Sequence, residues 1–358
     1  MYAGAVEIRE NISLAEYTTL GIGGAARWFA GAHSEDEMLQ AVEFAHSRNL
    51  PLFVLGGGSN LLVADAGFPG LVLHVCNRGL RREEDGTHTL FTAAAGEEWD
   101  SVVATAVAAN CAGMECLSGI PGTVGGTPVQ NVGAYGQEVA STLVRVRALD
   151  RQRLAWVEFD NAACHFSYRR SLFNTTAQGR YLVTEVTYRL LRDGAPQLAY
   201  KDIARWSQQQ MQEQTQGPLP APTLAAVRAA VRAIRREKGM LAGMGGPDGH
   251  SAGSFFKNPV IGVEQFASLV ETWPDAPHFP AGEGQVKVPA AWLMEQAGFH
   301  KGYALGAAGI SSKHTLALIN RGGATAAELL ALRDAIRQRV AEIFGIALEQ
   351  EPVYLSGE

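Results

Sequence analysis

Apolar and polar positions alternate between helix-like and strand-like patterns over the first 110 residues. Ser34 and Glu37 have the spacing of a capping box, which predicts a helix from this point to about His46. A second helix is predicted from about Glu98 to Asn110, and short apolar runs before it predict strands. These strands are expected at 51–55, 61–63, 71–75 and 90–95.

The chain becomes rich in strand patterns after residue 136. The runs 143–149 and 154–159 are predicted strands, and 181–191 alternates polar and apolar side chains as a half-buried strand does. This distribution indicates an α+β fold rather than a regular βαβ array.

A polar stretch separates these strands from the last third of the chain. Residues 207–222 contain a run of Gln, Gly217 and three prolines, and are predicted to form a linker or surface loop. The following helix is predicted over 223–238. Its apolar face is expected to contain Leu224, Val227, Val231 and Ile234. Its arginines fall largely elsewhere, at Arg228, Arg232, Arg235 and Arg236.

The C-terminal part ends in the clearest helix pattern of the sequence. Thr325 and Glu328 form a capping box at its start, and Gly345 is a C-terminal stop signal. The expected core face is Leu329, Leu332, Ile336, Val340 and Ile343. A shorter helix is predicted over 292–296.

The segment 119–136 contains one glycine in every three residues and no charged side chain. Backbone with so few side chains approaches a ligand closely, and amide dipoles bind anions without a lysine. The segment lacks the G-x-G-x-x-G fingerprint, and no apolar-periodic helix follows it. It is therefore predicted to bind a diphosphate through a different architecture.

Two shorter glycine clusters, 21–24 and 56–60, precede this segment. Taken alone, the cluster at 56–60 is equally consistent with a hairpin or a bulge between two strands. Three clusters in one part of the chain favour a large anionic cofactor, because converging polar groups are the usual sign of a binding site.

Composition excludes several classes of function. The formal charge of −6 argues against a general nucleic-acid binder. No segment approaches the roughly 20 apolar residues of a membrane span, and the N-terminus lacks the apolar core of a signal peptide. The four cysteines form no Cys-x-x-Cys pair, and the nine histidines show no metal-ligand spacing. We therefore expect a cytoplasmic protein with free thiols and no metal.

Four kinds of side chain are candidates for chemistry. Ser254 does not lie in a Gly-x-Ser-x-Gly elbow, so its hydroxyl is suited either to donating a proton or to capping a turn. Arg169 is suited to binding a carboxylate, and the glutamates of 348–352 to acid–base work; surface ion pairing is the alternative for both. His314 is a candidate for phosphate binding or an ordinary surface residue.

Taken together, these segments resemble the UDP-N-acetylenolpyruvoylglucosamine reductase (MurB) family. The matching motifs occur in the family's order and spacing over nearly the whole chain, so the set is much more specific than any one motif. They are Asn11 with 17–24, 55–62, 119–126 with 130–136, 166–169, 252–259, 291–298 and 348–351.

The resemblance implies an FAD enzyme of bacterial peptidoglycan synthesis. In this family, NADPH reduces the flavin, which passes hydride to C3 of the enolpyruvyl ether of UDP-N-acetylglucosamine, giving UDP-N-acetylmuramate. By motif match, Ser254 protonates C2, while Arg169 and Glu351 flank the substrate carboxyl and stabilise the enolate. Glu349, two residues earlier, is the alternative to Glu351.

The resemblance also implies two sets of binding residues. FAD, bound non-covalently, is expected to contact Gly56, Gly57, Gly58, Ser59, Asn60, Leu61, Ile120, Pro121, Gly122, Thr123, Gly125, Gly126 and Gly133. The substrate is expected to contact Tyr168, Tyr200, Lys238, Asn258 and Lys301. Tyr200 matches a tyrosine-bearing loop that covers the substrate diphosphate. The chain departs from the family's Lys-Leu-Pro after Lys238, where it reads Gly-Met-Leu, which leaves the aim of this lysine open.

The implied architecture is α+β, with a two-lobed FAD-binding domain of the vanillyl-alcohol-oxidase (PCMH-like) type and a separate α+β substrate-binding domain. The expected parts are 1–70 and 71–218 for the two lobes, 219–345 for the substrate domain, and a C-terminal strand at 346–358 that returns to the active site. A monomer acting on small molecules, without nucleic-acid or membrane partners, is expected.

Two other functions remain open from the sequence. One is an FAD oxidase or dehydrogenase of the same cofactor fold that acts on another substrate. The other is a flavin-binding regulator without turnover, which would bind FAD but would not be bleached by NADPH.

Overall fold

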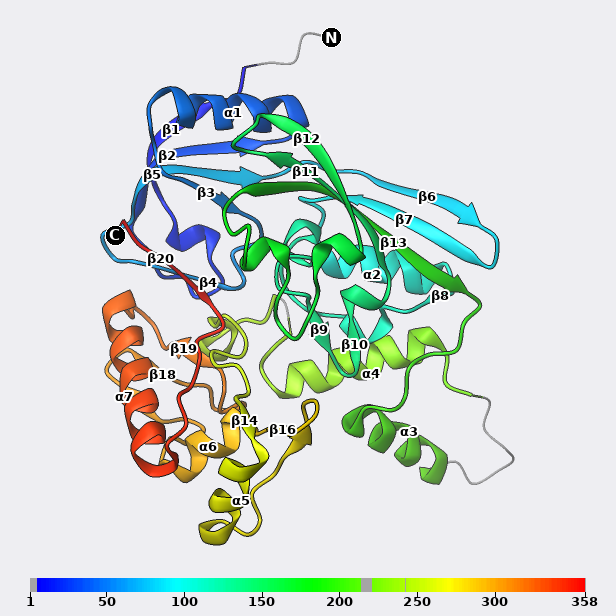
Figure 1. Ribbon diagram of the computed structural model, residues 1–358, viewed down its shortest axis with the longest axis vertical. Helices are drawn as coiled ribbons and strands as arrows, with labels where there is room; N and C mark the ends of the chain where they lie inside the picture. The colour runs from blue at the N-terminus through cyan, green and yellow to red at the C-terminus, as the bar shows by residue number, and fades with distance from the viewer. Residues whose placement is uncertain (1–4, 214–220, 242, 358) are drawn as a thin grey trace. The chain divides into compact units, whose positions relative to one another are not determined.

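A computed structural model describes residues 5–213, 221–241 and 243–357 of the chain, and Figure 1 shows its helices and strands. The chain divides into two compact units. Unit 1 consists of 1–12, 26–57 and 69–237, and unit 2 of 13–25, 58–68 and 238–358.

Unit 1 contains a four-stranded sheet in the order β1-β2-β5-β3, and β3 runs parallel to β5. Helix α1 packs on this sheet through Met38 and Val42, which join Ala30 and Leu71 in one buried cluster (Figure 1). The elements are β1 (Ile8–Ser13), β2 (Ala25–Ala32), α1 (Glu35–Ser47), β3 (Leu52–Leu55) and β5 (Phe68–Val75).

Unit 1 also contains a larger antiparallel sheet. Its order is β12-β11-β13-β7-β6, and the short strand β8 pairs with the end of β13. The central strand β13 forms where it was predicted, but it is not half-buried: 182–184 and 186–188 are buried, so both faces of the strand are covered there, and Tyr188 is fully buried. The strands are β6 (Leu80–Asp85), β7 (His88–Ala94), β8 (Cys111–Ala112), β11 (Leu143–Asp150), β12 (Ala155–Asp160) and β13 (Tyr181–Arg192).

Helix α2 (Trp99–Ala108) connects this sheet to the glycine-rich segment. The Trp99 ring packs against Tyr188 with 5.5 Å between ring centroids, and its indole N–H donates to the carbonyl of Leu117 at 3.1 Å. The segment that follows forms short turns and a small hairpin of β9 (Gly133–Ala134) and β10 (Gln137–Glu138).

Helices α3 (Lys201–Glu213) and α4 (Leu224–Glu237) also belong to unit 1. The predicted linker at 207–222 is therefore wrong over 207–213, where the Gln run continues α3; residues 214–220 lie outside the described part. Glutamine is a good helix former, and Ile203 at the start of α3 packs with Val227 and Val231 of α4. Tertiary packing thus extends the helix into a stretch that looked like a loop.

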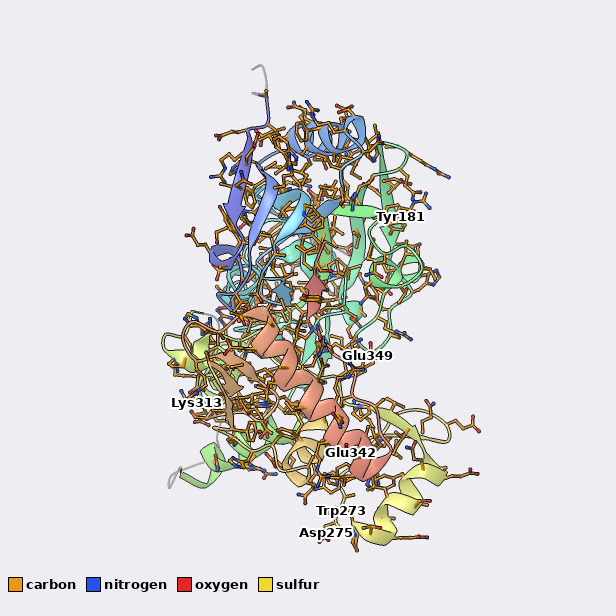
Figure 2. All side chains as sticks on the ribbon, turned by 90° about the vertical axis from the view of Figure 1, so that its left-hand side faces the viewer. Tyr181, Trp273, Asp275, Lys313, Glu342 and Glu349 are labelled. Atoms are coloured by element: carbon orange, nitrogen blue, oxygen red, sulfur yellow. The ribbon has the colours of Figure 1, made fainter. Side chains whose placement is uncertain are left out.

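Unit 2 is built around a cluster of buried side chains from three helices and several short strands. Trp273, at the end of α5 (Figure 2), packs against Trp292 of α6 and Phe344 of α7 with centroid distances of 5.9 and 5.6 Å. The helices are α5 (Val263–Thr272), α6 (Ala290–Gln296) and α7 (Ala326–Phe344). The strands are β4 (Leu61–Val63), β14 (Val260–Gly262), β15 (Phe279–Pro280), β16 (Gln285–Lys287), β17 (Ala304–Leu305), β18 (Ala308–Ile310), β19 (Leu318–Asn320) and β20 (Val353–Leu355).

Helix α7 follows its sequence signals closely. The Thr325 hydroxyl accepts from the Glu328 amide while the Glu328 carboxylate accepts from the Thr325 amide, so the predicted capping box is confirmed. Gly345 ends the helix with a φ of 63°, and the predicted core residues Leu329, Leu332, Ile336 and Val340 are buried. Ile343, the fifth predicted core residue, is partly buried against the same cluster.

The two units differ in their boundaries from the expected three-part division, which stays a prediction. Helix α4 belongs to unit 1 because its apolar face packs against that unit. In unit 2, β20 pairs in parallel with β4, with Val353 opposite Leu61. Within the described residues, no helix has both the length and the apolar character that crossing a membrane requires.

Candidate active site

Two glycine loops of unit 1 lie against each other. A Cβ added to Gly57 would meet the Cα of Gly122 at 2.7 Å, and one added to Gly56 would meet the Thr123 hydroxyl at 2.7 Å. Real Cβ atoms do not approach backbone this closely, so only glycine allows the contact at Gly57. The structure thus brings together the two clusters that were predicted to share one ligand.

Several amide groups of the segment 119–136 are used within the fold. The amides of Val124, Gly125 and Gly126 donate to protein carbonyls at 2.9, 2.8 and 3.1 Å. In the described part of the chain, hydrogen bonds do not engage the amides of Gly57 and Gly122. The amides of Val124, Gly125 and Gly126 therefore stabilise the turn itself, and the binding of a ligand by other amides of the segment stays a prediction.

The remaining predicted cofactor residues fall in both units. Ile120, Pro121, Gly122, Thr123, Gly125, Gly126 and Gly133 belong to unit 1, while Gly58, Ser59, Asn60 and Leu61 belong to unit 2. Gly58 has a φ of 60°, and a Cβ there would lie 1.8 Å from the Tyr17 carbonyl oxygen. A Cβ added to Gly126 would meet no atom within 4 Å, so this glycine faces open space. Leu61 is buried in β4.

Arg169 has a constrained backbone and a directed side chain. Its φ is 58°, in the left-handed region that non-glycine residues rarely adopt. The Asn174 side chain donates to the Arg169 carbonyl at 3.0 Å, and the Arg169 guanidinium donates to the Gly133 carbonyl at 3.1 Å. The guanidinium also lies over the Tyr168 ring, 5.5 Å from its centroid. Tyr168 and Arg169 are therefore adjacent to the end of the glycine-rich segment.

Tyr200 is anchored to the hairpin of the same segment. Its exposed ring meets the Tyr135 ring edge-on, with 5.4 Å between centroids. Three residues earlier, the Gln197 amide donates at 2.8 Å to Glu115, whose side chain is fully buried. Glu115 also accepts from the Gly113 amide and the Gln137 side chain, both at 2.9 Å. A buried carboxylate that accepts three hydrogen bonds thus fixes the base of the Tyr200 loop.

In unit 2, the structure brings Ser254 and Glu351 to neighbouring positions on paired segments. The Glu351 amide donates to the carbonyl of Phe255 at 2.9 Å, and Phe256 pairs with Gln350. Both Ser254 and Glu351 are partly buried.

Glu349, the alternative carboxylate, has a different environment. It lies on the C-terminal segment after α7 (Figure 2), its side chain is 67% exposed, and it forms an ion pair with Lys257.

The three remaining substrate candidates have different environments in unit 2. Asn258 uses its side-chain oxygen to accept from the Ala290 amide, at the first residue of α6, at 2.9 Å. Lys301 is exposed, and Lys238 is partly buried directly after α4. His314, the other phosphate candidate, accepts through Nδ1 from the Leu316 amide at 3.0 Å, so one ring nitrogen is used in a turn.

One group near the glycine-rich segment was not identified from the sequence. Asp100 of α2 accepts from Arg228 at 2.6 Å, from Arg232, and from the Gly119 amide at 2.6 Å. Burial raises the pKa of Asp100, but the hydrogen bonds from Arg228 and Gly119 and the nearby positive charges outweigh it and hold this pKa below its usual value. The only sequence signal was the spacing of the arginines along α4.

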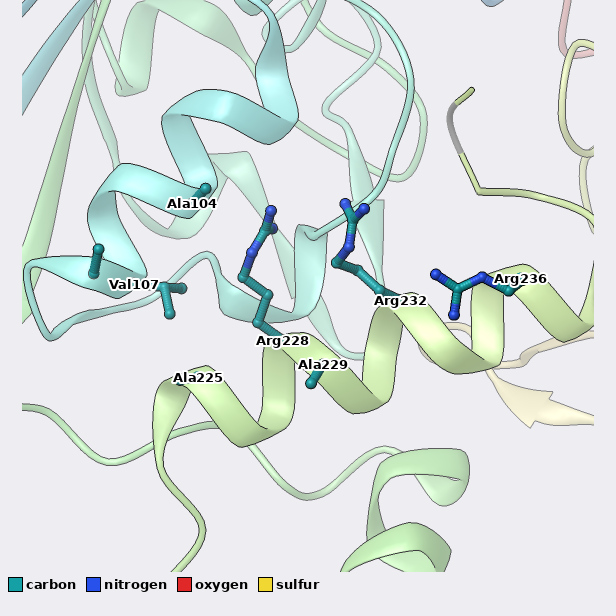
Figure 3. Close-up of a pocket in the computed structure, with 8 residues that line it drawn as sticks. Ala104, Val107, Ala225, Arg228, Ala229, Arg232 and Arg236 are labelled. Carbon is teal, nitrogen blue, oxygen red and sulfur yellow. The ribbon is translucent and has the colours of Figure 1, made fainter. Parts of the chain in front are cut away.

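These arginines line a groove of about 500 Å³ between α2 and α4. Figure 3 shows Arg228, Arg232 and Arg236 on α4, with Ala104 and Val107 of α2 on the other side. Among the described residues, no group of three or more His, Cys, Asp and Glu side chains is placed to hold a metal ion.

The chain is similar to known proteins over nearly its whole length. Residues 246–355 match the family model described as UDP-N-acetylenolpyruvoylglucosamine reductase, C-terminal domain, and residues 26–152 match an FAD binding domain. The UDP-N-acetylenolpyruvoylglucosamine reductase of Thermobifida fusca is 45% identical over 354 residues, covering 96% of this chain and 97% of that protein. The one from Streptomyces coelicolor is 44% identical over 350 residues, covering 95% and 88%.

Among solved structures, the crystal structure of UDP-N-acetylenolpyruvylglucosamine reductase from Thermus caldophilus has a TM-score of 0.65 and 26% identity. It covers 98% of this chain and 99% of that one. These matches confirm the predicted α+β class, with an FAD-binding domain and a separate C-terminal domain.

Proposed function

Because the chain belongs to the UDP-N-acetylenolpyruvoylglucosamine reductase family, we propose that it reduces UDP-N-acetylglucosamine enolpyruvate to UDP-N-acetylmuramate, with FAD as cofactor and NADPH as reductant. This is an oxidoreductase step of bacterial peptidoglycan synthesis. The observation that supports the assignment of chemistry is the pairing of 255–257 with 349–351, which joins the segment directly after Ser254 to the segment that carries Glu351.

The residues of the glycine loops fit FAD. The contact between Gly57 and Gly122 excludes side chains where a cofactor must approach backbone, and the amides of these two residues are available to an anion. No charged side chain occurs in 119–136, so amides rather than lysines would hold the diphosphate. When bound, FAD supplies the transfer of hydride from NADPH to C3 of the enolpyruvyl group.

Hydride addition at C3 leaves a pair of electrons on C2, conjugated with the substrate carboxylate. Arg169 supplies the cation that stabilises this charge, since its guanidinium is held in place by Gly133 and Tyr168. Ser254 donates a proton to C2, which completes the reduction of the double bond. Glu351 flanks the carboxyl and keeps the Ser254 proton in position.

The substrate's diphosphate and sugar are assigned to a second set of residues. Tyr200 is exposed on a loop that Glu115 anchors, which suits it to covering a bound ligand. Lys238 and Lys301 supply positive charge, and Asn258 supplies a side-chain NH₂. We expect the enzyme to act as a monomer in the cytoplasm.

The decisive experiment measures NADPH oxidation by the FAD-loaded protein with and without the enolpyruvyl nucleotide sugar. Oxidation that depends on this substrate supports the reductase. Flavin bleaching by NADPH without substrate dependence identifies an enzyme that acts on another substrate, and FAD binding without bleaching identifies a regulator.

A second experiment tests the proton donor. Ser254→Ala is expected to leave flavin reduction by NADPH nearly unchanged and to slow reoxidation by the substrate by about 10²–10⁴-fold. Ser268→Ala, on the exposed surface of α5, is the control. Equal losses in both half-reactions would remove Ser254 from this role.

A further inference from the structure

We propose that Asp100, Arg228, Arg232 and Arg235 form a brace that positions the loop 119–123 for FAD, and that Asp100 is its central positioning residue. This inference rests on the proposed FAD site. It adds a role for helix α4, whose arginines have no part in the chemistry proposed above.

Asp100 holds the amide side of Gly119. Its Oδ1 accepts from the Gly119 amide and from Arg228 Nη1, both at 2.6 Å. Its Oδ2 accepts from Arg228 Nη2 at 3.0 Å and from Arg232 Nη1. The Asp100 side chain is 13% exposed and that of Arg228 16%, so water screens this pair only weakly, whereas the Arg232 side chain is 34% exposed.

Arg235 holds the carbonyl side of the same glycine. Its Nε donates to the Gly119 carbonyl at 3.0 Å, and its guanidinium is hydrogen-bonded to the Tyr135 side chain. Arg235 is only 9% exposed. The N–H and the C=O of Gly119 are therefore both fixed by α2 and α4.

The geometry of α4 explains why one helix can do this. Arg228, Arg232 and Arg235 are spaced by four and three residues, so they lie on one face of the helix. Val227 and Val231 are buried against Ile203 and Cys116, which fixes the rotation of the helix about its axis. Figure 3 shows Arg228 and Arg232 reaching from α4 toward α2.

A brace is needed because the loop cannot order itself through side chains. Gly119 has a φ of 73° and Gly122 a φ of 119°, conformations that only glycine adopts readily. A loop free to sample other conformations would have to be ordered by FAD at a cost in affinity. Fixing Gly119 in advance removes part of that cost for Ile120 and Gly122, which are among the proposed FAD contacts.

Arg236 provides a matched control within the same groove. It lies one turn beyond Arg232, lines the groove and is exposed. Among the described residues, no hydrogen bond or ion pair joins it to Asp100. Arg236→Gln therefore removes the same charge from the same helix without touching the brace.

The test is a titration of flavin-free protein with FAD, followed by flavin fluorescence. Asp100→Asn is expected to weaken FAD binding at least tenfold, and Arg236→Gln less than twofold. At saturating FAD, the rate of flavin reduction by NADPH in Asp100→Asn is expected to stay near that of the wild type, since the reacting groups are untouched. The comparison requires that the wild-type protein binds FAD. If the wild type does not bind FAD, the proposed function is rejected, whereas the brace is rejected by the variants described below.

Arg232→Gln covers the case in which Asp100→Asn does not fold, because Arg228 still pairs with Asp100. Its FAD affinity is expected to fall about threefold and to return with Arg232→Lys, while thermal unfolding of the flavin-free protein stays close to that of Arg236→Gln. The brace would be rejected if Asp100→Asn and Arg232→Gln bind FAD as the wild type does, or if Arg236→Gln weakens binding as much as they do.

Discussion

The Arg169 guanidinium donates a hydrogen bond to the carbonyl oxygen of Gly133, with 3.1 Å between nitrogen and oxygen. This bond joins the proposed carboxylate-binding arginine to the end of the glycine-rich segment. The left-handed backbone of Arg169 is held by Asn174, so both the backbone and the side chain of this arginine have an assigned partner.

The first prediction concerns the guanidinium of Arg169. A lysine cannot bind the Gly133 carbonyl and a carboxylate at once with the planar geometry of arginine. Arg169→Lys is therefore expected to slow flavin reoxidation by the substrate by about 10²-fold, as loss of an oxyanion-stabilising group does. Stopped-flow measurement of the two half-reactions checks this. Arg170→Lys, at the exposed neighbouring position, should behave as the wild type; equal effects at both positions would contradict the assignment.

The second prediction separates the two C-terminal carboxylates. Glu351→Gln keeps the shape of the side chain but removes the charge that is proposed to act with Ser254, so the substrate half-reaction should slow by at least tenfold. Glu349→Gln removes only an exposed ion pair with Lys257, which contributes about 0–1 kcal/mol. Its kcat/KM should remain within twofold of the wild type. A larger loss in Glu349→Gln than in Glu351→Gln would reverse the assignment.

Local signals account for the parts of the fold that the sequence predicts well. The capping box of Thr325 and Glu328 and the stop at Gly345 lie within the helix they define, and each appears as predicted. The prediction of a loop at the Gln run after Ser207 was wrong. The helix there is supported by packing between Ile203 of α3 and Val227 of α4, and no local sequence pattern contains such a contact.

In the candidate site, too, local signals could be predicted and remote contacts could not. Its motifs are glycine-rich and short, so their residue types indicate a cofactor, but their partners are remote. Asp100 looks like an ordinary helix residue, and its ligands Arg228 and Arg232 lie 128 and 132 residues further along the chain. Only the folded packing of α2 against α4 makes it a partner of Gly119.

The third prediction concerns the contact between the two glycine loops. In Gly57→Ala, the new methyl group would lie 2.7 Å from the Cα of Gly122, so the backbone must move. Overpacking of this kind destabilises a protein by about 1–3 kcal/mol. Denaturant unfolding of the flavin-free protein measures the loss, and FAD affinity should fall with it. Gly245→Ala, where a Cβ meets nothing within 4 Å, is the control and should change stability by less than about 0.5 kcal/mol. An unchanged Gly57→Ala would contradict the close packing.

The fourth prediction concerns the anchor of the Tyr200 loop. Glu115 accepts hydrogen bonds from Gly113, Gln137 and Gln197, so Glu115→Gln would direct an NH₂ group at one of these donors. The loop should loosen, and KM for the nucleotide sugar should rise about tenfold, since one or two buried hydrogen bonds are lost. Flavin reduction by NADPH should stay nearly unchanged. Glu295→Gln, in unit 2, is the control for a general loss of a carboxylate; a rise in its KM of the same size would contradict the anchor.

The fifth prediction uses the cysteine beneath the same loop. Burial raises the pKa of Cys116 to about 12, and that of Cys164 to about 12 as well. Only the thiolate reacts with a disulfide reagent, so both thiols should be inert at pH 8, where each is almost fully protonated. Cys111 is buried too, so the partly exposed Cys76 is the one thiol that a reagent can reach, and burial raises the pKa of Cys76 as well, which slows its reaction. Titration with an aromatic disulfide should therefore count at most one thiol in the folded protein, four after denaturation, and none in folded Cys76→Ser.

The thiol count also reports on the loop. The Cys116 thiol donates to the Gln197 carbonyl, so a loop released by Glu115→Gln should uncover it. A second thiol reacting in Glu115→Gln, absent when Cys116 is also replaced by Ser, would show that the loop has left its anchor. Rapid reaction of Cys116 in the wild type would instead contradict the buried position of this thiol. No gain of reactivity in Glu115→Gln, together with an unchanged KM, would show that Glu115 does not hold the loop.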